Sequence, residues 1–438
     1  MKKLLLFIVA ALFFIQIKAQ THTIEIHSQN RTASLLMSPA EYASWKNNDD
    51  FNNSVIREAL FQDVYQKFDD DFDFIFLILN EDTRPNNLPF GQLMQVSNTV
   101  TGIGISIYDE TANYGSAGKL QAVMHLTQKD YLRNGPSLHE LMHNWGNFGI
   151  PTESVNAPGT NLNSFNFQPH WGFTGGNTPG QLGGFAQASL IDNGGGSYTV
   201  NEFGPNANGG NAIPYNELEL YLMGMTPVSS VSNFDVFTDI TSLSINLPTF
   251  DFEDSTRTTY TPASLVALLG ARVPNVAITQ KDFKLLTITL TDTPLTPAEF
   301  DAADVFSEEF GRNASDGWSS YNFWEATNGL GTIETGNLQN NVLAVSDVNN
   351  NNNNNNNNIT RIYPNPATDK ITIEFNDSSM VNQEISIYNL VGQKVNTLLS
   401  SKSQNKQVID LSKLPSGIYF IQFVNKQQQM VTKKISIK

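Results

Sequence analysis

A run of ten asparagines, Asn349 to Asn358, most constrains how this chain of 438 residues can fold. The run has no apolar side chain to bury, so it cannot join a hydrophobic core and is expected to be flexible. Together with its neighbours it predicts a linker over residues 346–360. A folded unit must lie on each side, and a chain of this length exceeds what one hydrophobic core usually organises.

The first 19 residues have the pattern of a secretory signal peptide. Lys2 and Lys3 precede a mostly apolar run from Leu4 to Ile17, and Ala19 provides a small residue at the expected cleavage site. A membrane anchor is the alternative, but the run is shorter than the roughly 20 residues that a spanning helix needs. The pattern therefore predicts an exported chain without an integral membrane span.

The composition favours a globular protein that does not bind nucleic acid. Hydrophobic residues make up 40% of the chain and charged residues only 16%, unlike a disordered chain. The net charge of −16 resides in the central region, because residues 1–20 and 361–438 are each net positive. Such a surface repels nucleic acid and anionic lipid. The chain has no cysteine, so its stability must come from its cores and any bound metal.

Residues 361–438 alternate apolar and polar positions with a period of two, interrupted by turn residues. This pattern predicts a small all-β sandwich. Its motifs, in chain order, are Tyr363-Pro364-Asn365-Pro366, Ile387-Tyr388-Asn389, Gly392, Leu414-Pro415-Ser416-Gly417-Ile418-Tyr419 and Lys433-Lys434-Ile435.

This set of motifs resembles the C-terminal sorting domain of type IX secretion cargo in Gram-negative bacteria. The resemblance implies that the type IX secretion machinery is a partner of residues 361–438. It also implies export through the periplasm and outer membrane to the cell surface or the medium. The alternative, an ordinary adhesion-like β module, would share the strands but does not predict these turn motifs.

The region between the signal peptide and the linker, residues 20–345, mixes strand and helix patterns. Apolar residues recur about every four positions between Ile56 and Phe68, which predicts a helix that begins near Asn53. Short apolar or β-branched segments predict strands at residues 21–37, 72–79, 101–108 and 120–127.

The next predicted element is a helix that carries His139, Glu140 and His143, with Pro136-Ser137 at its start and Gly146 at its end. Histidines four apart project from one helix face, so their two ring nitrogens can bind one zinc ion. Glu140 is adjacent to the first histidine, where its carboxylate can take a proton from a water molecule that zinc has acidified. With only six histidines in the chain, this spacing is informative.

The helix and the strands before it resemble the zincin metallopeptidases. That resemblance implies an α+β zincin-like catalytic domain over residues 20–345, His139 and His143 as zinc ligands, and Glu140 as the general base. It also implies that an edge strand aligns a peptide substrate. The motif shares Gly146 with the metzincins, but their next ligand would fall at Gly149, whose side chain cannot bind metal. The chain is therefore neither a standard metzincin nor a standard gluzincin.

The third zinc ligand is predicted from the residues that follow the motif. His170 is the only later histidine, and Glu217 and Glu219 lie on a predicted second helix over residues 214–224; Glu153 is a weaker alternative. The chain also resembles secreted bacterial HExxH proteins with a downstream His-Trp pair and an acidic-Leu-Tyr-Leu-Met-Gly segment. That resemblance favours His170 together with Glu219, as ligand or as support for a ligand. Residues 156–211 are rich in Gly and Asn and predict cleft walls made of loops.

These patterns together predict a secreted zinc peptidase that hydrolyses peptide bonds in proteins or peptides. The alternative is a non-catalytic binding or adhesion protein on a zincin scaffold. Calcium is a second candidate cofactor, because acidic residues cluster from Asp69 to Asp73, although a solvated run of charges explains that cluster better. His125 is expected to lie in the core or the cleft and not to bind metal.

Overall fold

The structure is a computed structural model that describes residues 22–152, 154–155, 165–166, 169–201, 203–204, 210–315, 317–338, 359–363, 367–375, 384–389, 393–399, 406–424 and 430–437. The predicted signal peptide and nearly all of the predicted linker lie outside the described residues. The chain divides into two compact units, unit 1 (Met1–Asn341) and unit 2 (Val342–Lys438). Within the described residues, no helix is both long enough and apolar enough to span a bilayer.

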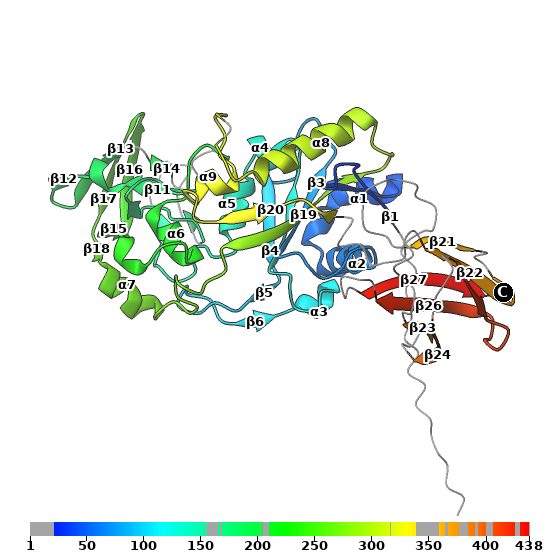
Figure 1. Cartoon of the computed structure of the whole chain (residues 1–438). Helices are drawn as coiled ribbons and strands as arrows, with labels where there is room; N and C mark the ends of the chain where they lie inside the picture. Colours follow the sequence, from blue (N-terminus) through cyan, green and yellow to red (C-terminus); the bar gives the residue numbers. More distant parts are fainter. Residues whose placement is uncertain are drawn as a thin grey trace, which may run out of the picture. The chain divides into compact units, whose positions relative to one another are not determined.

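Unit 1 has a mixed α/β architecture around a seven-stranded sheet (Figure 1). The strand order is β1-β2-β19-β3-β7-β4, and β20 pairs with β19. Strands β2, β19, β3 and β7 run parallel, whereas β1 and β4 are antiparallel to their neighbours. The strands are β1 (Thr23–Ile26), β2 (Ala33–Leu36), β3 (Phe74–Leu79), β4 (Gly91–Gln95), β7 (Ala122–Leu126), β19 (Asp282–Thr291) and β20 (Thr332–Glu334).

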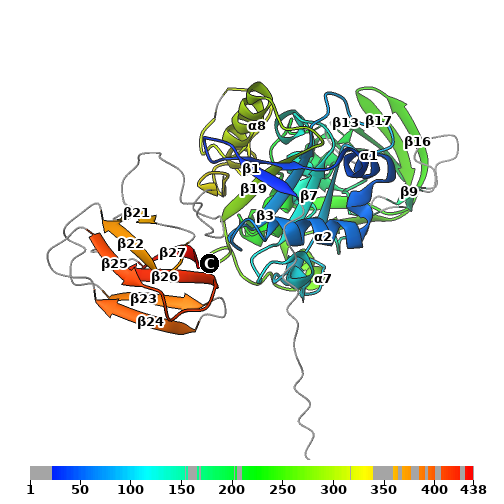
Figure 2. The same ribbon diagram turned by 90° about the vertical axis from the view of Figure 1, so that its right-hand side faces the viewer.

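Helices cover both faces of this sheet (Figure 2). On one face, Trp45 and Phe51 pack against His125 of β7, with ring centroids 5.7 and 5.2 Å apart. On the other face, Phe310 packs against Phe76 of β3 at 6.1 Å. The helices around the sheet are α1 (Pro39–Asn48), α2 (Ser54–Val64), α3 (Thr111–Tyr114), α4 (Tyr131–Asn134), α5 (Ser137–Met142), α8 (Pro297–Phe310) and α9 (Phe323–Ala326).

The described residues between 171 and 260 form a β-rich lobe. The loops predicted over residues 156–211 are found only in part: Pro169 and His170 line a cleft, but short strands also occur among the described residues of this stretch, because Phe173, Phe185 and Phe203 belong to a separate aromatic core. Within this core, the ring centroid of Phe173 lies 4.9 Å from that of Phe203 and 5.1 Å from that of Phe252. The lobe contains β10 (Gly175–Gly176), β11 (Gly184–Ala186), β12 (Ile191–Gly194), β13 (Ser197–Asn201), β14 (Phe203–Gly204), α6 (Glu217–Met223), β15 (Phe234–Phe237), β16 (Ile240–Asn246), β17 (Thr249–Asp254) and β18 (Arg257–Tyr260), and α7 (Pro262–Leu269) follows it.

The predicted strands near residues 72–79 and 120–127 and the predicted helix near 53–68 are confirmed as β3, β7 and α2. The predicted strand over residues 101–108 is wrong. Gly102 and Gly104 adopt φ angles of +77° and +87°, which a regular strand excludes, and only Thr101 forms an isolated bridge, to Val273. The strand β5 (Ser97–Asn98) and the strand β6 (Tyr108–Asp109) flank this loop. One edge strand of the sheet is β4, which the sequence analysis did not predict.

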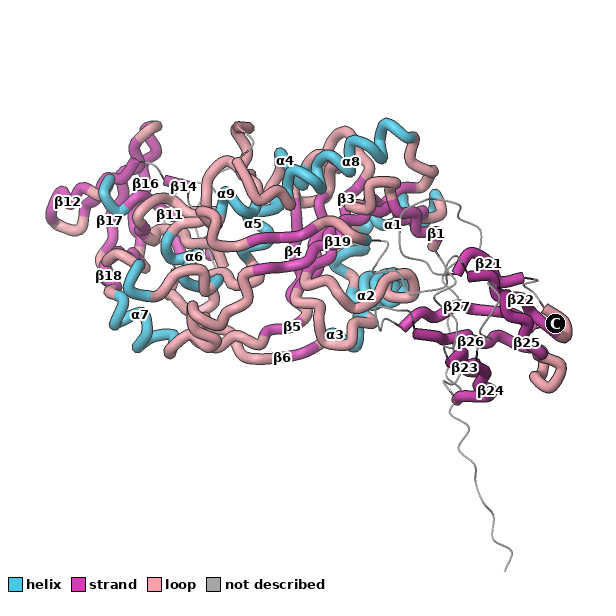
Figure 3. The backbone as a smooth tube through the Cα atoms, in the orientation of Figure 1, coloured by secondary structure: helices cyan, strands magenta, loops and turns pink. Residues whose placement is uncertain are grey.

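Unit 2 consists of β-strands, as predicted (Figure 3). Two sheets, ordered β21-β22-β25 and β24-β23-β26-β27, bury alternate apolar side chains between them, many of them isoleucine. The period of two in the sequence therefore corresponds to strand faces. The strands are β21 (Ile359–Tyr363), β22 (Lys370–Phe375), β23 (Glu384–Asn389), β24 (Lys394–Leu399), β25 (Lys406–Asp410), β26 (Gly417–Val424) and β27 (Met430–Ile437).

Candidate metal centre

Helix α5 carries the predicted histidine motif. The helix spans Ser137–Met142, and His143 forms its C-cap, so it ends earlier than the predicted end at Gly146. His139 and His143 still project from one face, and their ring centroids lie 4.9 Å apart. The whole helix is buried against the sheet, because Leu138, Leu141 and Met142 belong to the main hydrophobic core. This packing holds both imidazoles in place.

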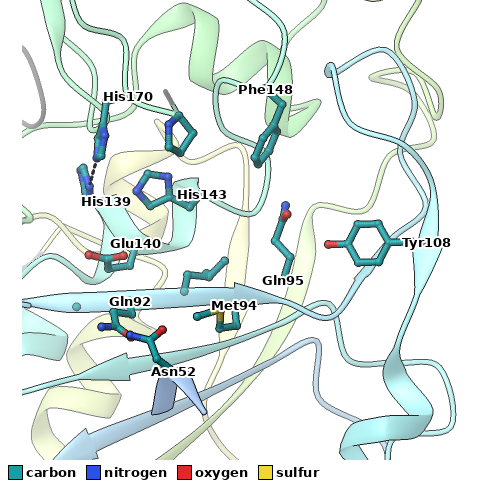
Figure 4. Close-up of a pocket in the computed structure, with 13 residues that line it drawn as sticks. Asn52, Gln92, Met94, Gln95, Tyr108, His139, Glu140, His143, Phe148 and His170 are labelled. Carbon is teal, nitrogen blue, oxygen red and sulfur yellow. Dashed lines mark hydrogen bonds between the residues drawn. The ribbon is translucent and has the colours of Figure 1, made fainter. Parts of the chain in front are cut away.

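His170 completes a group of three imidazoles (Figure 4). Its ring centroid lies 5.2 Å from that of His139 and 5.1 Å from that of His143. One ring nitrogen from each histidine lies within 4.8 Å of the others, and the Nε2 atoms of His139 and His170 are 3.3 Å apart. The structure thus brings together the two motif histidines and the predicted third one, although His170 is 27 residues beyond His143.

The surroundings of His139 and His143 keep both imidazoles neutral, which is the form that binds metal. Burial and the neighbouring His170 lower the pKa of His139 to about 4. Burial and the other two histidines also lower the pKa of His143 well below its usual value. The Nδ1 atom of His139 lies 2.6 Å from the backbone carbonyl oxygen of Gln181, which can only accept, so Nδ1 carries the proton. The Nε2 lone pair of His139 therefore faces the other two rings, as metal binding requires.

Glu140 lies beside the three histidines, in the same cleft (Figure 4). The edge strand β4 passes close to it: a Cβ atom on Gly91 would come within 2.7 Å of Glu140 Cγ. A glycine at position 91 therefore leaves room for the carboxylate. Burial raises the pKa of Glu140 to about 8. A cation held by the histidines would oppose this rise, because it favours the ionised carboxylate.

The cleft is open and has a volume of about 680 Å³. Strand β4 contributes one wall, and the loops around Phe148 and His170 contribute the opposite one (Figure 4). Tyr108 and Gln95 lie away from the histidines, toward the other end. The lining residues are Asn52, Gly91, Gln92, Leu93, Met94, Gln95, Tyr108, His139, Glu140, His143, Phe148, Pro169 and His170.

Glu219, the other predicted ligand, does not belong to the group of side chains that can hold one metal. It is fully buried in helix α6, and its carboxylate accepts hydrogen bonds from Trp171 Nε1 (3.0 Å) and from the backbone N–H groups of Leu182 (2.8 Å) and Gln181 (3.0 Å). It also completes a capping box by accepting from the N–H group of Asn216 at 3.0 Å. Burial raises the pKa of Glu219, and these four hydrogen bonds oppose the rise.

Glu217 and Glu153 are the two remaining acidic candidates for the third zinc ligand. The carboxylate of Glu217 accepts hydrogen bonds from the N–H group of Asn177 and from Ser232 Oγ, each at 3.1 Å. Glu217 therefore supports a neighbouring loop and does not reach the histidines. Glu153 lies outside the described residues.

The acidic run from Asp69 to Asp73 is solvated only in part, because Asp69 is exposed and Asp70 and Asp71 are partly exposed, whereas Asp73 is not. Asp73 is buried and accepts hydrogen bonds from the N–H group of Lys284 at 2.8 Å and from Gln121 at 3.1 Å. Asp70 accepts from the N–H group of Ala117 at 2.8 Å. These carboxylates hold two loops at the start of the central strands. They are not part of the histidine group, and calcium stays a prediction.

Sequence reasoning missed two contributors to the site, strand β4 and the carbonyl of Gln181. The segment GQLMQ of β4 has a short, mostly polar pattern, so it lacks the β-branched enrichment that marks a strand. A backbone carbonyl carries no sequence signal at all. The glycines around Gln181 are the only local indication that this loop makes close contacts.

Comparison with protein families concerns unit 2. Residues 361–438 match the family described as the secretion system C-terminal sorting domain. The predicted sorting domain is therefore confirmed, together with its partner, the type IX secretion machinery, and its destination, the cell surface or the medium. No curated protein matches the chain.

Among solved structures, the chain is similar to a DUF3244 family protein with an immunoglobulin-like β-sandwich fold from Bacteroides vulgatus. The two are 14% identical over 18% of this chain and 85% of that chain, with a TM-score of 0.16. It is also similar to dimeric latent PorU from Porphyromonas gingivalis, at 22% identity over 18% of this chain and 9% of that chain, with a TM-score of 0.15. TM-scores this low carry no argument about fold or function.

Proposed function

We propose that unit 1 is a zinc-dependent peptidase with a zincin-like fold, exported by means of unit 2. The observation that carries this proposal is the convergence of three imidazoles beside Glu140 in an open cleft, with the pKa values of His139 and His143 lowered by burial. A set of three histidines leaves one position of a tetrahedral zinc ion for water or substrate, as in catalytic sites and unlike closed structural ones.

The residues of the site have separate tasks in this proposal. His139, His143 and His170 hold the metal through one ring nitrogen each. Zinc in such a site polarises a carbonyl group and lowers the pKa of water. Glu140 takes a proton from the water molecule whose oxygen adds to the carbonyl carbon of the substrate. It then gives that proton to the amide nitrogen as the C–N bond breaks, so that the carboxylate returns to its starting state.

Strand β4 supports a peptide as the substrate. It is the last strand in the order of the sheet and lines the cleft beside Glu140. An edge strand presents unpaired backbone groups, and an extended peptide can pair with them. A peptide paired with β4 in this way would run past Glu140, with its carbonyl groups close to the carboxylate.

The test uses the purified full chain, its zinc content and a peptide-library cleavage assay. We expect bound zinc and cleavage by the natural chain, and a loss of cleavage of about 10²- to 10⁴-fold in Glu140→Gln with zinc retained, because a general base contributes about this much. Glu110→Gln, an exposed glutamate outside the cleft lining, is the matched control and should cleave normally.

Undiminished cleavage by Glu140→Gln would refute the proposed mechanism. Absence of zinc from the natural chain would refute the proposed zinc site. Zinc binding without any cleavage would instead favour the second class of function, a non-catalytic binding or adhesion protein on the same scaffold. These three outcomes are distinct, because zinc content and cleavage are measured on the same samples.

A further inference from the structure

Glu219 lies in helix α6, outside the group of side chains that can hold a metal. Its carboxylate nevertheless contacts two segments that each lead to a metal-holding histidine. One segment is the loop at residues 180–182, and the other is the indole of Trp171, directly after His170. A single buried carboxylate thus connects two parts of the site that are far apart in the sequence.

The first connection leads to His139. Glu219 accepts hydrogen bonds from the N–H groups of both Gln181 and Leu182, which holds their peptide groups in one orientation. The carbonyl of Gln181 then lies 2.6 Å from Nδ1 of His139. A partner on one imidazole nitrogen determines which nitrogen carries the proton and in which direction the other one points.

The second connection leads to His170. Glu219 accepts a hydrogen bond from Trp171 Nε1 at 3.0 Å, and Trp171 is only 1% exposed. The N–H group of Trp171 also donates to the carbonyl of Leu182 at 2.9 Å, so the two segments are joined to each other. The carboxylate that orients the Gln181 peptide therefore also positions the backbone next to His170.

The close approach at Gly180 shows how tightly the loop surrounds this carboxylate. A Cβ atom on Gly180 would come within 2.4 Å of Glu219 Oε1. Any larger residue at position 180 must push the loop away from Glu219 or turn the carboxylate. Either movement would displace the carbonyl of Gln181 from His139.

We propose that Glu219 is a positioning residue that sets the geometry of two of the three metal-holding histidines, His139 through the Gln181 peptide and His170 through Trp171. This inference rests on the proposed zinc site and extends it to a residue that does not touch the metal. His143 is outside its reach, and its Nδ1 atom has no hydrogen-bond partner among the described residues.

The test measures zinc affinity by competition with a chromophoric chelator, using the full chain and its variants. Glu219→Gln keeps the shape of the side chain but turns one acceptor oxygen into an N–H donor that faces other donors. We expect its zinc dissociation constant to rise about 10- to 100-fold, as is usual when a group that orients a ligand is lost. Glu217→Gln, two residues away on the same helix, is the matched control and should stay within about threefold of the natural chain.

A second readout separates positioning from general damage to the fold. The visible spectrum of bound Co²⁺ depends on the geometry of its ligands, so it should change in Glu219→Gln and not in Glu217→Gln. If Glu219→Gln does not fold, Trp171→Phe and Gly180→Ala replace it, since each disturbs one connection. We expect each of them to weaken zinc binding.

The outcomes distinguish this inference from the proposed function. If the natural chain binds no zinc, both the proposed function and the role of Glu219 are refuted. A natural chain that binds zinc, with Glu219→Gln of equal affinity and an unchanged Co²⁺ spectrum, would overturn only the role of Glu219. If Glu219→Gln does not fold, unchanged zinc binding in both Trp171→Phe and Gly180→Ala would overturn it as well.

Discussion

The two units bury different kinds of side chains. Unit 2 encloses an aliphatic core, in which Ile371, Ile387 and Ile421 are fully buried. Unit 1 has a larger apolar core, but next to it lie three imidazoles and two buried carboxylates, Glu140 and Glu219. Apolar packing depends on volume and pattern, and it tolerates many substitutions that conserve both. A buried polar group depends on individual partners, and losing one of them leaves another without its hydrogen bond.

This difference has a consequence for function. Unit 2 can be identified as a sorting domain from its sequence, because its strands and turns repeat a local pattern. The candidate metal centre depends instead on contacts between segments that are distant in the sequence, such as Trp171 with Glu219, 48 residues apart, and His139 with Gln181, 42 residues apart. Substitutions in unit 1 should therefore change metal affinity, the pH dependence of stability or activity. Substitutions in the core of unit 2 should change only the stability of unit 2.

The largest expected effect is on metal binding. His170→Ala removes one of three ligands, so its zinc dissociation constant should rise by more than about 100-fold, the upper end of the range for losing a group that only supports a ligand. The measurement is chelator competition on the full chain. His125→Gln is the control, because His125 is buried on the opposite face of the sheet, against Trp45 and Phe51. Equal affinity of His170→Ala and the natural chain would show that His170 is not a ligand.

Zinc should stabilise unit 1 without affecting unit 2. A ligand that binds only the folded state stabilises it by about 2.7 kcal/mol when its free concentration is 100 times the dissociation constant. The midpoint for unfolding of unit 1 should therefore rise with zinc concentration, while that of unit 2 stays constant. Scanning calorimetry of the full chain checks this, with the unfolding of each unit assigned by tryptophan fluorescence, since residues 342–438 contain no tryptophan. A parallel rise of both transitions would mean that zinc acts on the whole chain.

The third effect is a loss of folding stability at acidic pH, which is caused by His125. Burial lowers the pKa of this histidine from 6.5 to about 3, and its Nε2 accepts a hydrogen bond from Trp45 Nε1 at 3.1 Å. Below pH 6.5 the imidazole of His125 binds a proton in the unfolded chain, whereas in the folded chain it stays neutral down to about pH 3. Stability is thus complete above pH 6.5 and falls between pH 6.5 and 3, by about 2 kcal/mol at pH 5.

The measurement for this effect is urea unfolding at pH 5 and pH 7.5, compared between the natural chain and His125→Gln. The variant keeps an acceptor for Trp45 and should lose that part of the pH dependence. Unit 2 provides an internal control, because residues 342–438 contain no histidine. An identical loss of stability on acidification in both chains would show that His125 does not contribute.

The smallest effect is expected in the aliphatic core. Ile387→Val removes one methylene from a fully buried position and should cost about 0.5–1.5 kcal/mol of the stability of unit 2. Val408 is 58% exposed, so Val408→Ala should change that stability by less than about 0.5 kcal/mol. Zinc affinity should be the same in both variants. A weaker zinc site in Ile387→Val would contradict the independence of the two units.

Where the structure disagrees with the sequence analysis, the cause is tertiary. Residues 101–108 alternate like a strand, yet two glycines with positive φ angles make this segment a loop that contacts Ala271 and Gly149. Strand β4 looks too polar for a strand, but it pairs with β7 over its whole length. Backbone pairing with a distant segment overrides local preference in β4, whereas the close approach of the two glycines to other loops prevents strand pairing in residues 101–108.

The sequence by itself determined the division into two units, the β pattern of unit 2 and the common helix face of His139 and His143. Each of these follows from a short repeat or spacing that is local in the chain. Only the tertiary structure decided that His170 lies beside the other two histidines and that Glu219 accepts hydrogen bonds from Trp171 and from the loop that contacts His139. Both residues lie on loops and helices that meet across 27 to 48 residues of sequence, and no pattern within one segment contains that information.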